Sequence, residues 1–185
     1  MKSAQVWMKG TAICTLLLGL SLQSPALALA KDHHANEPVV NVKLMNTKGE
    51  TIGSATLTQK QDAVVLHVEA SKLTPGEHGI HFHETGKCDA PDFKTAGAHF
   101  NPAVKQHGFN NPKGFHAGDL PNLKVDAGGS VKADFETRVV TLMPGKPNSL
   151  LKTGGVALVI HDKADDYVTD PSGNSGDRIA CGVIQ

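Results

Sequence analysis

Aromatic side chains and excess charge are both scarce in this sequence. Phe, Trp and Tyr make up 4% of the 185 residues, and the only tryptophan, Trp7, lies near the amino terminus. So few aromatic side chains provide no stacking platform for bases or sugars. The 18 basic and 18 acidic side chains balance, so the chain also lacks the positive charge that binds nucleic acid or an acidic membrane surface.

Long hydrophobic runs are absent except near the amino terminus. The run from Thr11 to Leu22 is too short to span a bilayer comfortably. Lys2 and Lys9 precede it and Ala28-Leu29-Ala30 follows it, an order typical of a secretory signal and its cleavage site. We therefore expect residues 1–30 to be a signal peptide.

A signal peptide predicts that the mature chain is exported, to the periplasm, the cell envelope or the outside of the cell. We expect residues 31–38 to form a flexible tail and residues 39–185 to form one domain. Without the signal, 16 basic and 18 acidic side chains remain, so neither a nucleic acid nor a membrane is the expected partner. The alternative, an uncleaved membrane anchor, would need a longer apolar run.

Cysteine is also rare, with three residues in all. Cys14 lies in the predicted signal, which leaves Cys88 and Cys181. An even number of cysteines in an exported chain indicates a disulfide, and the alternative is two unrelated buried thiols. A bridge that closes so long a loop would contribute roughly 4–5 kcal/mol in the chain-entropy model.

The body of the chain has the pattern of short strands. Apolar and polar residues alternate in Val- and Thr-rich segments, and Ala127-Gly128-Gly129 predicts a turn within one of them. No stretch has helical periodicity of comparable length. We count about eight strands at the spacing of a sandwich or barrel. The segments outside the histidine-rich region are 39–47, 51–59, 62–70, 122–143, 154–161 and 178–184.

Histidines are concentrated in one part of the chain. Five of the ten lie between Gly79 and Asp119. Unpaired imidazoles buried in a core would cost free energy, because their polar nitrogens would lack partners. The density therefore favours metal binding over core packing, and two metal ions over one.

The later part of this region predicts a closed zinc site. The segment 98–123 is rich in Gly, Pro and Asn and has no regular periodicity, so we expect a long ordered loop. It offers three imidazole nitrogens and one carboxylate, a set that suits tetrahedral zinc with no open position. The alternative is a polar surface loop that happens to carry histidines. The four candidate ligands are His99, His107, His116 and Asp119.

The earlier part predicts a copper site. His81 and His83 are two positions apart, so on a strand they point to the same face. The pair alone is weak support, but His161 ends another expected strand. With a shared His99 these residues make a four-nitrogen set that suits a cupric ion. Sharing is chemically reasonable because an imidazole has two nitrogens.

Five motifs together resemble the copper/zinc superoxide dismutase family, of the exported bacterial kind. They are GIHFHETGKC, AGAHFNP, HAGDLPNL, VIHDKADD and GDRIACGVI. The resemblance extends from about Val39 to Ile184. It implies an all-β fold, an eight-stranded Greek-key β-barrel (an immunoglobulin-like sandwich) with a long zinc loop and a second active-site loop.

The resemblance also implies the cofactors, the substrate and the roles of particular residues. Copper would alternately oxidise and reduce superoxide, with Arg178 positioning the anion and His99 carrying a proton. Asp165 would join His81 to His107, and a Cys88–Cys181 bridge is typical of the family. The implied copper ligands are His81, His83, His99 and His161, and the implied zinc ligands are His99, His107, His116 and Asp119.

Two matters stay open at this point. The same histidines would serve a copper- or zinc-binding module that buffers or delivers metal without turnover. Arg178 and a shared His99 argue for the enzyme, because metal storage needs neither. The sequence is compatible with a monomer or a homodimer.

Overall fold

A computed structural model describes residues 37–185. The predicted signal peptide and most of the predicted tail lie outside the described residues. The described chain contains nine strands and one short 3-10 helix, and none of its helices is long and apolar enough to cross a membrane. The elements are β1 (Val39–Asn46), β2 (Thr51–Gln59), β3 (Val64–Ala70), β4 (Gly76–His78), β5 (Ile80–His83), η1 (Lys94–Ala96), β6 (Leu123–Val125), β7 (Val131–Thr137), β8 (Val156–His161) and β9 (Arg178–Ile184).

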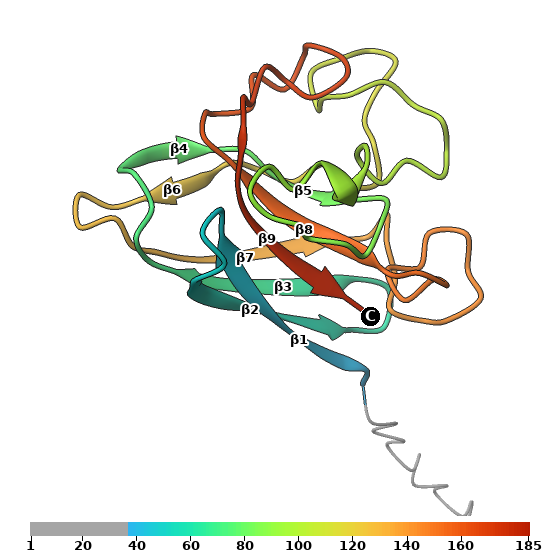
Figure 1. Ribbon diagram of the computed structural model, residues 1–185. Coiled ribbons are helices and arrows are strands. Elements are labelled where there is room, and N and C mark those ends of the chain that lie inside the picture. Colours follow the sequence, from blue (N-terminus) through green and yellow to red (C-terminus); the bar gives the residue numbers. More distant parts are fainter. Residues whose placement is uncertain (1–36) are drawn as a thin grey trace, which may run out of the picture. The chain divides into compact units, whose positions relative to one another are not determined.

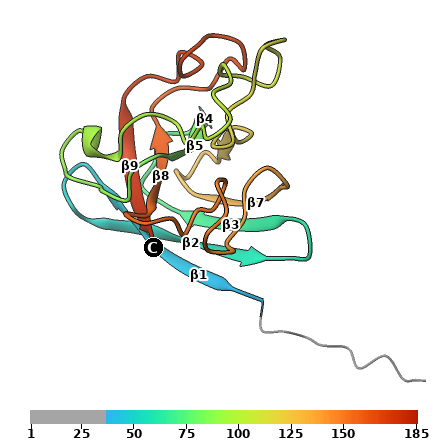
Figure 2. The ribbon, with the colours of Figure 1, turned by 90° about the vertical axis from the view of Figure 1, so that its right-hand side faces the viewer.

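Seven strands form one curled antiparallel sheet. Its order is β5-β8-β9-β1-β2-β3-β7, and β4 pairs with β6 as a separate two-stranded sheet (Figures 1 and 2). Only Gly79 separates β4 from β5. These two strands are therefore consecutive parts of one path, whose first half pairs with β6 and whose second half pairs with β8. The predicted all-β fold is confirmed, and the interruption at Gly79 accounts for nine elements where about eight strands were expected.

The strands follow the alternation in the sequence. In β3 every second side chain is buried, because one face covers the core while the other meets solvent. Strand β8 differs, since all six of its residues are buried. One of its faces packs in the main core through Leu158 and Ile160. The other face, with Ala157 and Val159, is covered by the segment that carries Phe93. Packing on both faces therefore holds the strand that ends at His161.

The segment predicted as a strand through Met143 ends earlier than expected. Strand β7 stops at Thr137, and the prediction for the following residues was wrong. Leu142 is buried there, but its amide donates to the Gln59 side chain (2.7 Å) rather than to a neighbouring strand. The Thr141 hydroxyl bonds to the same Gln59 oxygen at 2.8 Å. A buried side chain thus satisfies a main-chain N–H that strand pairing would otherwise satisfy.

Two long loops lie at one side of the barrel, near β5 and the end of β8 (Figure 1). We call residues 99–122 the zinc loop and residues 162–177 the second loop. The zinc loop runs back along β5, because the Phe82 amide donates to the Gly118 carbonyl (2.9 Å) and the Phe100 amide donates to the Phe82 carbonyl (2.8 Å). Both ends of the zinc loop are thereby fixed beside β5 and its two histidines.

Candidate metal centre

Four buried histidines from three parts of the chain converge beside β5. His81 and His83 lie on β5, His161 ends β8, and His99 begins the zinc loop. One ring nitrogen from each lies within 4.8 Å of one from every other. The Nε2 atoms of His83 and His161 are 3.4 Å apart. The structure thus brings the four predicted copper ligands together.

The other nitrogens of these rings have fixed partners. His83 Nδ1 lies 2.9 Å from the Gly97 carbonyl, and His161 Nδ1 lies 3.2 Å from the Gly176 carbonyl. Each contact requires a proton on Nδ1, which leaves Nε2 of the same ring as the free lone pair. The carbonyls therefore determine which nitrogen of each ring faces the others.

The second donor set gathers around the carboxylate of Asp119. Its Oδ1 atom lies 3.0 Å from His99 Nδ1, 3.0 Å from His107 Nδ1 and 3.3 Å from His116 Nδ1. Donor atoms about 2.0–2.1 Å from a tetrahedral zinc ion are themselves separated by about 3.3 Å. Asp119 Oδ2 accepts the backbone N–H groups of Gly108 and His116, both at 3.0 Å. The carboxylate is thus oriented by the loop that it closes, and the spacing fits zinc.

Two buried ring nitrogens have no hydrogen-bond partner among the residues that the structure describes. They are His81 Nδ1 and His99 Nε2. Both rings belong to the four predicted copper ligands, which we call the copper set. Buried polar atoms are nearly always satisfied, so atoms without a partner call for an explanation. A metal ion bound by both lone pairs would supply it. In that arrangement His99 would hold zinc through Nδ1 and copper through Nε2.

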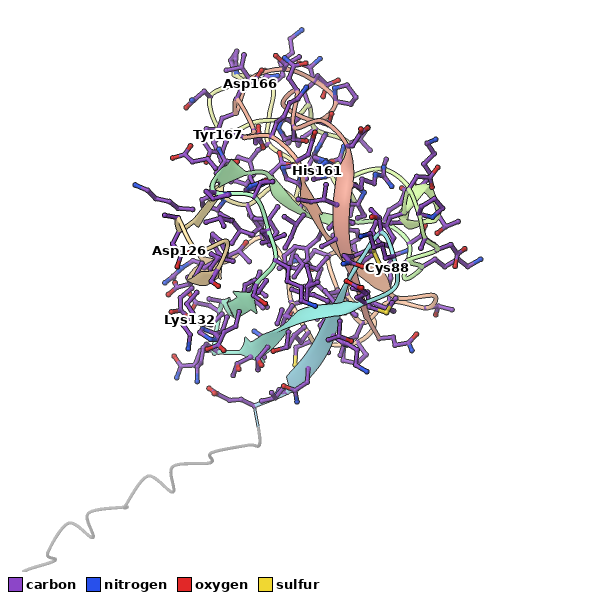
Figure 3. The ribbon with its side chains drawn as sticks, turned by 60° about the vertical axis from the view of Figure 1, so that its left-hand side comes forward. Cys88, Asp126, Lys132, His161, Asp166 and Tyr167 are labelled. Carbon is purple, nitrogen blue, oxygen red and sulfur yellow. A yellow bond between two sulfur atoms is a disulfide. The ribbon has the colours of Figure 1, made fainter. Side chains whose placement is uncertain are left out.

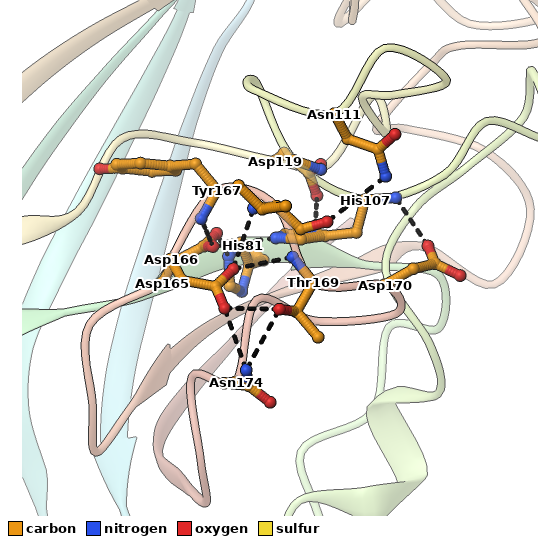
Figure 4. A network of polar contacts seen from close by, with 12 residues as sticks. His81, His107, Asn111, Asp119, Asp165, Asp166, Tyr167, Thr169, Asp170 and Asn174 are labelled. Atoms are coloured by element: carbon orange, nitrogen blue, oxygen red, sulfur yellow. Dashed lines mark hydrogen bonds and ion pairs between the residues drawn. The ribbon is translucent and has the colours of Figure 1, made fainter.

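Asp165 in the second loop connects the two donor sets. Its Oδ2 lies 2.9 Å from His81 Nε2, and its Oδ1 lies 2.9 Å from His107 Nε2 (Figure 4). A carboxylate at the far nitrogen of a metal-binding imidazole fixes its tautomer and ring orientation. These are the contacts that the family resemblance implied for Asp165.

Burial keeps the copper-set histidines neutral. It lowers the pKa of His81 to about 3 and the pKa of His161 to about 4. It also lowers the pKa values of His83 and His99. A neutral imidazole retains a lone pair for a metal ion, whereas a protonated one does not.

The four predicted zinc ligands, which we call the zinc set, include groups whose charged forms are stabilised. Burial opposes the charged form of His107, but Asp119 and Asp165 outweigh it and raise the pKa of His107 to about 9. Burial likewise opposes ionisation of Asp119, yet hydrogen bonds from the histidines around it hold its pKa well below the usual range. A cation is thus favoured beside Asp119, and zinc would take the place of a proton there.

Arg178 is held close to the copper set at the start of β9. Its Nη1 donates to the Phe93 carbonyl and its Nη2 donates to the Gly97 carbonyl, both at 2.7 Å. The Gly97 carbonyl is also the partner of His83 Nδ1. One main-chain oxygen therefore fixes both a predicted ligand and the predicted anion-positioning residue. A cavity of about 480 Å³ beside Arg178 is also lined by Asp92, Lys94 and Asp177.

The two remaining cysteines form the predicted disulfide. Cys88 and Cys181 are 93 residues apart in sequence. Cys181 is fully buried against Phe93 and Val159. The bridge joins β9 to the segment that supplies the carbonyl partners of Arg178. Figure 3 shows the position of Cys88. It also shows His161 below the loop that carries Asp166 and Tyr167.

Several supporting groups were not predicted from the sequence. They include the Gly97 and Gly176 carbonyls and the side chain of Asp170, which accepts the His107 backbone N–H at 2.7 Å. A main-chain carbonyl has no sequence signature. The sequence held one partial signal of these supports, the glycine at position 173. A Cβ atom on Gly173 would lie 1.8 Å from Asp165 Oδ1. Only glycine leaves space for that carboxylate.

Comparison with known proteins agrees with this geometry. A family model described as copper/zinc superoxide dismutase (SODC) matches residues 51–184. Superoxide dismutase (Cu-Zn) 1 of Aquifex aeolicus is 47% identical over 175 residues, which cover 94% of this chain and 96% of the relative.

Solved structures give the same result. A superoxide dismutase-like protein from Bacillus subtilis is 44% identical, with a TM-score of 0.76 over 78% of this chain and 97% of that one. The Cu/Zn superoxide dismutase from Brucella abortus is 28% identical, with a TM-score of 0.62 over 80% of this chain and 100% of that one. The chain therefore belongs to the copper/zinc superoxide dismutase family.

Proposed function

We propose that this protein converts two superoxide ions and two protons into dioxygen and hydrogen peroxide. The observation that carries the proposal is a pair of complete donor sets that meet at one histidine, His99. Every expected ligand position holds a residue able to bind its metal. The residues that would hold copper are His81, His83, His99 and His161, and those that would hold zinc are His99, His107, His116 and Asp119.

Bound copper supplies the alternate gain and loss of one electron that the reaction requires. The chain supplies the field and the proton. Arg178 keeps a positive charge beside His83, where its planar donors suit a small dioxygen anion.

His99 is the group that would carry the proton. Its Nδ1 is held at Asp119, its Nε2 is buried without a hydrogen-bond partner in the described chain, and the residue belongs to the copper set. The ring is therefore anchored through one nitrogen, and the other can take up a proton and release it without a change of orientation. We infer that Nε2 takes a proton as dioxygen leaves and gives it to the reduced second superoxide, which takes its other proton from solvent and leaves as hydrogen peroxide.

The same residues bear on location and assembly. The Cys88–Cys181 disulfide suits an oxidising compartment outside the cytoplasm, and we propose export through a signal peptide at residues 1–30. All the proposed ligands come from one chain. A monomer and a homodimer would therefore each contain complete sites.

Metal content and superoxide decay test the proposal together. We expect about one copper and one zinc per chain in the purified protein, and rapid decay that slows as salt screens Arg178 and Lys94. Metal content can be measured by mass spectrometry and decay by pulse radiolysis at low and high salt. Full copper occupancy without decay would contradict the proposal and identify a metal-handling module instead.

Replacement of Arg178 should slow the reaction without loss of metal. Arg178→Ala removes charge-assisted hydrogen bonds to the anion, so we expect a loss of about 10- to 100-fold in rate. Arg178→Lys should fall between that variant and the native protein, because lysine keeps the charge but lacks the planar fork. The measurement is the decay rate per bound copper. An unchanged rate, or loss of copper in parallel with the rate, would refute the positioning role.

A further inference from the structure

We infer that Tyr167 is a positioning residue that joins the zinc loop to the second loop and aims Asp165 at its two histidines. The inference rests on the proposed function, since the zinc that it concerns is the one proposed above. Tyr167 is the only tyrosine in the chain. It lies in the second loop, two residues after Asp165 (Figure 4).

Tyr167 uses all of its polar groups and its ring in contacts around the site. Its amide donates to Asp165 Oδ1 at 2.7 Å, and its carbonyl accepts the Asn110 N–H of the zinc loop at 2.9 Å. Its hydroxyl accepts the backbone N–H of Asn122 at 2.7 Å. Its ring packs against Phe109 with centroids 5.7 Å apart. One residue thus connects three stretches of chain.

The hydroxyl reaches Asp165 through Asn122. The Asn122 side chain donates to the Asp165 carbonyl at 2.9 Å and accepts the Asp165 N–H at 2.8 Å. Both main-chain polar groups of Asp165 are therefore held by one amide side chain, whose own backbone is held by Tyr167. The carboxylate that these contacts aim lies 2.9 Å from both His81 Nε2 and His107 Nε2.

The backbone around Tyr167 is shaped for this role. Tyr167 has a φ of 62°, in the left-handed region that residues other than glycine rarely adopt. Gly108 has a φ of 102°, and a Cβ atom there would lie 2.2 Å from the Tyr167 carbonyl oxygen. The zinc loop thus approaches Tyr167 more closely than any side chain would permit. A rare backbone conformation persists where surrounding contacts determine it.

None of these contacts uses a nitrogen that would bind a metal. These contacts therefore do not require a bound metal, and they direct the carboxylate toward both rings. Other contacts cross between the loops, such as the His107 amide to Asp170 at 2.7 Å. We consequently expect loss of Tyr167 to loosen the zinc site rather than abolish it.

Two substitutions separate the hydroxyl from the ring. Tyr167→Phe keeps the ring but leaves the Asn122 N–H without its acceptor, and Tyr167→Leu removes both contacts. Val168→Ala is a matched control, because Val168 is the next residue and its side chain is half exposed. Removal of outer partners of metal ligands typically costs 10- to 100-fold in affinity. We expect zinc release to accelerate about 10-fold in Tyr167→Phe and about 100-fold in Tyr167→Leu, and to stay unchanged in the control.

Zinc release is measured with a chromogenic chelator on disulfide-intact protein loaded with zinc alone. Hydrogen exchange of the metal-free protein provides the second readout, with faster exchange expected in residues 107–119 and 162–177 of both Tyr167 variants. If Tyr167→Phe and Tyr167→Leu release zinc and exchange hydrogen at the rates of the native protein, the inference is overturned. A fall in global unfolding midpoint of the metal-free protein that fully accounts for the faster release would overturn it as well, since that indicates general stability.

The outcome is distinguishable from failure of the proposed function. If the native protein binds metals but does not remove superoxide, the proposed function fails while zinc release still tests Tyr167. If the native protein binds no zinc, hydrogen exchange of the two loops in the metal-free protein tests the role of Tyr167 instead. Should Tyr167→Leu fail to fold, the conservative Tyr167→Phe variant carries the test.

Discussion

Replacement of His99 by glutamine should weaken both metals and abolish dismutation. His99 Nδ1 lies 3.0 Å from Asp119 Oδ1, whereas His99 Nε2 has no partner in the described chain and belongs to the copper set. No other residue belongs to both of these donor sets. A loss of about 4 kcal/mol of stabilisation at the reacting centre corresponds to roughly 1000-fold in rate. We expect at least that loss in His99→Gln.

Two matched variants isolate the shared role. His161→Gln should release copper and leave zinc, because His161 belongs only to the copper set. His116→Gln should release zinc and leave copper for the opposite reason. Each affected metal should bind more than about 100-fold more weakly, since even loss of an outer partner costs about 10–100-fold.

The measurement is competitive titration of each metal against a chelator of known affinity, with superoxide decay recorded on the same samples. Retention of zinc at native affinity in His99→Gln would show that His99 does not bridge. A loss of both metals in all three variants would also count against the bridge, because it would mean that any ligand change collapses the whole site.

Removal of the disulfide should destabilise the protein by roughly 4–5 kcal/mol. A bridge between residues 93 positions apart restricts the unfolded chain strongly, and the chain-entropy model gives that magnitude for a loop of this length. A suitable variant combines Cys88→Ser with Cys181→Ala, because Cys181 is buried among apolar side chains. The free energy of unfolding of the metal-free variant is then compared with that of the native protein in denaturant.

The disulfide variant should also react more slowly. The bridge holds β9 against the segment that carries the Phe93 and Gly97 carbonyls, and both carbonyls position Arg178. Addition of reductant to the native protein should reproduce both effects, and reductant should not change the variant further. A change in unfolding free energy below about 1 kcal/mol would rule out the stabilising role expected for so long a loop.

Several strands were predictable because apolar and polar residues alternate along them, as in β3. Residues 51–59 and 178–184 were predicted with the bounds that the structure has. The prediction for 122–143 failed beyond Thr137, since the buried polar side chain of Gln59 bonds to Thr141 and Leu142 from a distant strand. Such contacts join residues more than eighty positions apart, and no local pattern in the sequence indicates them.

The candidate site was predictable in its donors and less so in their supports. His81 and His83 share a strand face, and that spacing can be read locally. By contrast, the pairing of Arg178 and His83 at one Gly97 carbonyl depends on how β9 and the segment after β5 meet. Asn122 and Tyr167 gave no signal either, because each is an ordinary loop residue until the two loops lie together.

The sequence by itself determined which donor atoms this protein has, because imidazole, carboxylate and thiol chemistry belongs to residue type. It also determined the strands that carry several of those donors, because alternation is a local property. Only the tertiary structure decided that His99 Nδ1 lies at Asp119, and that Asp165 directs one oxygen to His81 and the other to His107. Those relations arise from barrel closure and loop packing. Hydrogen bonds between distant residues determine them, so they exist only once the chain has folded.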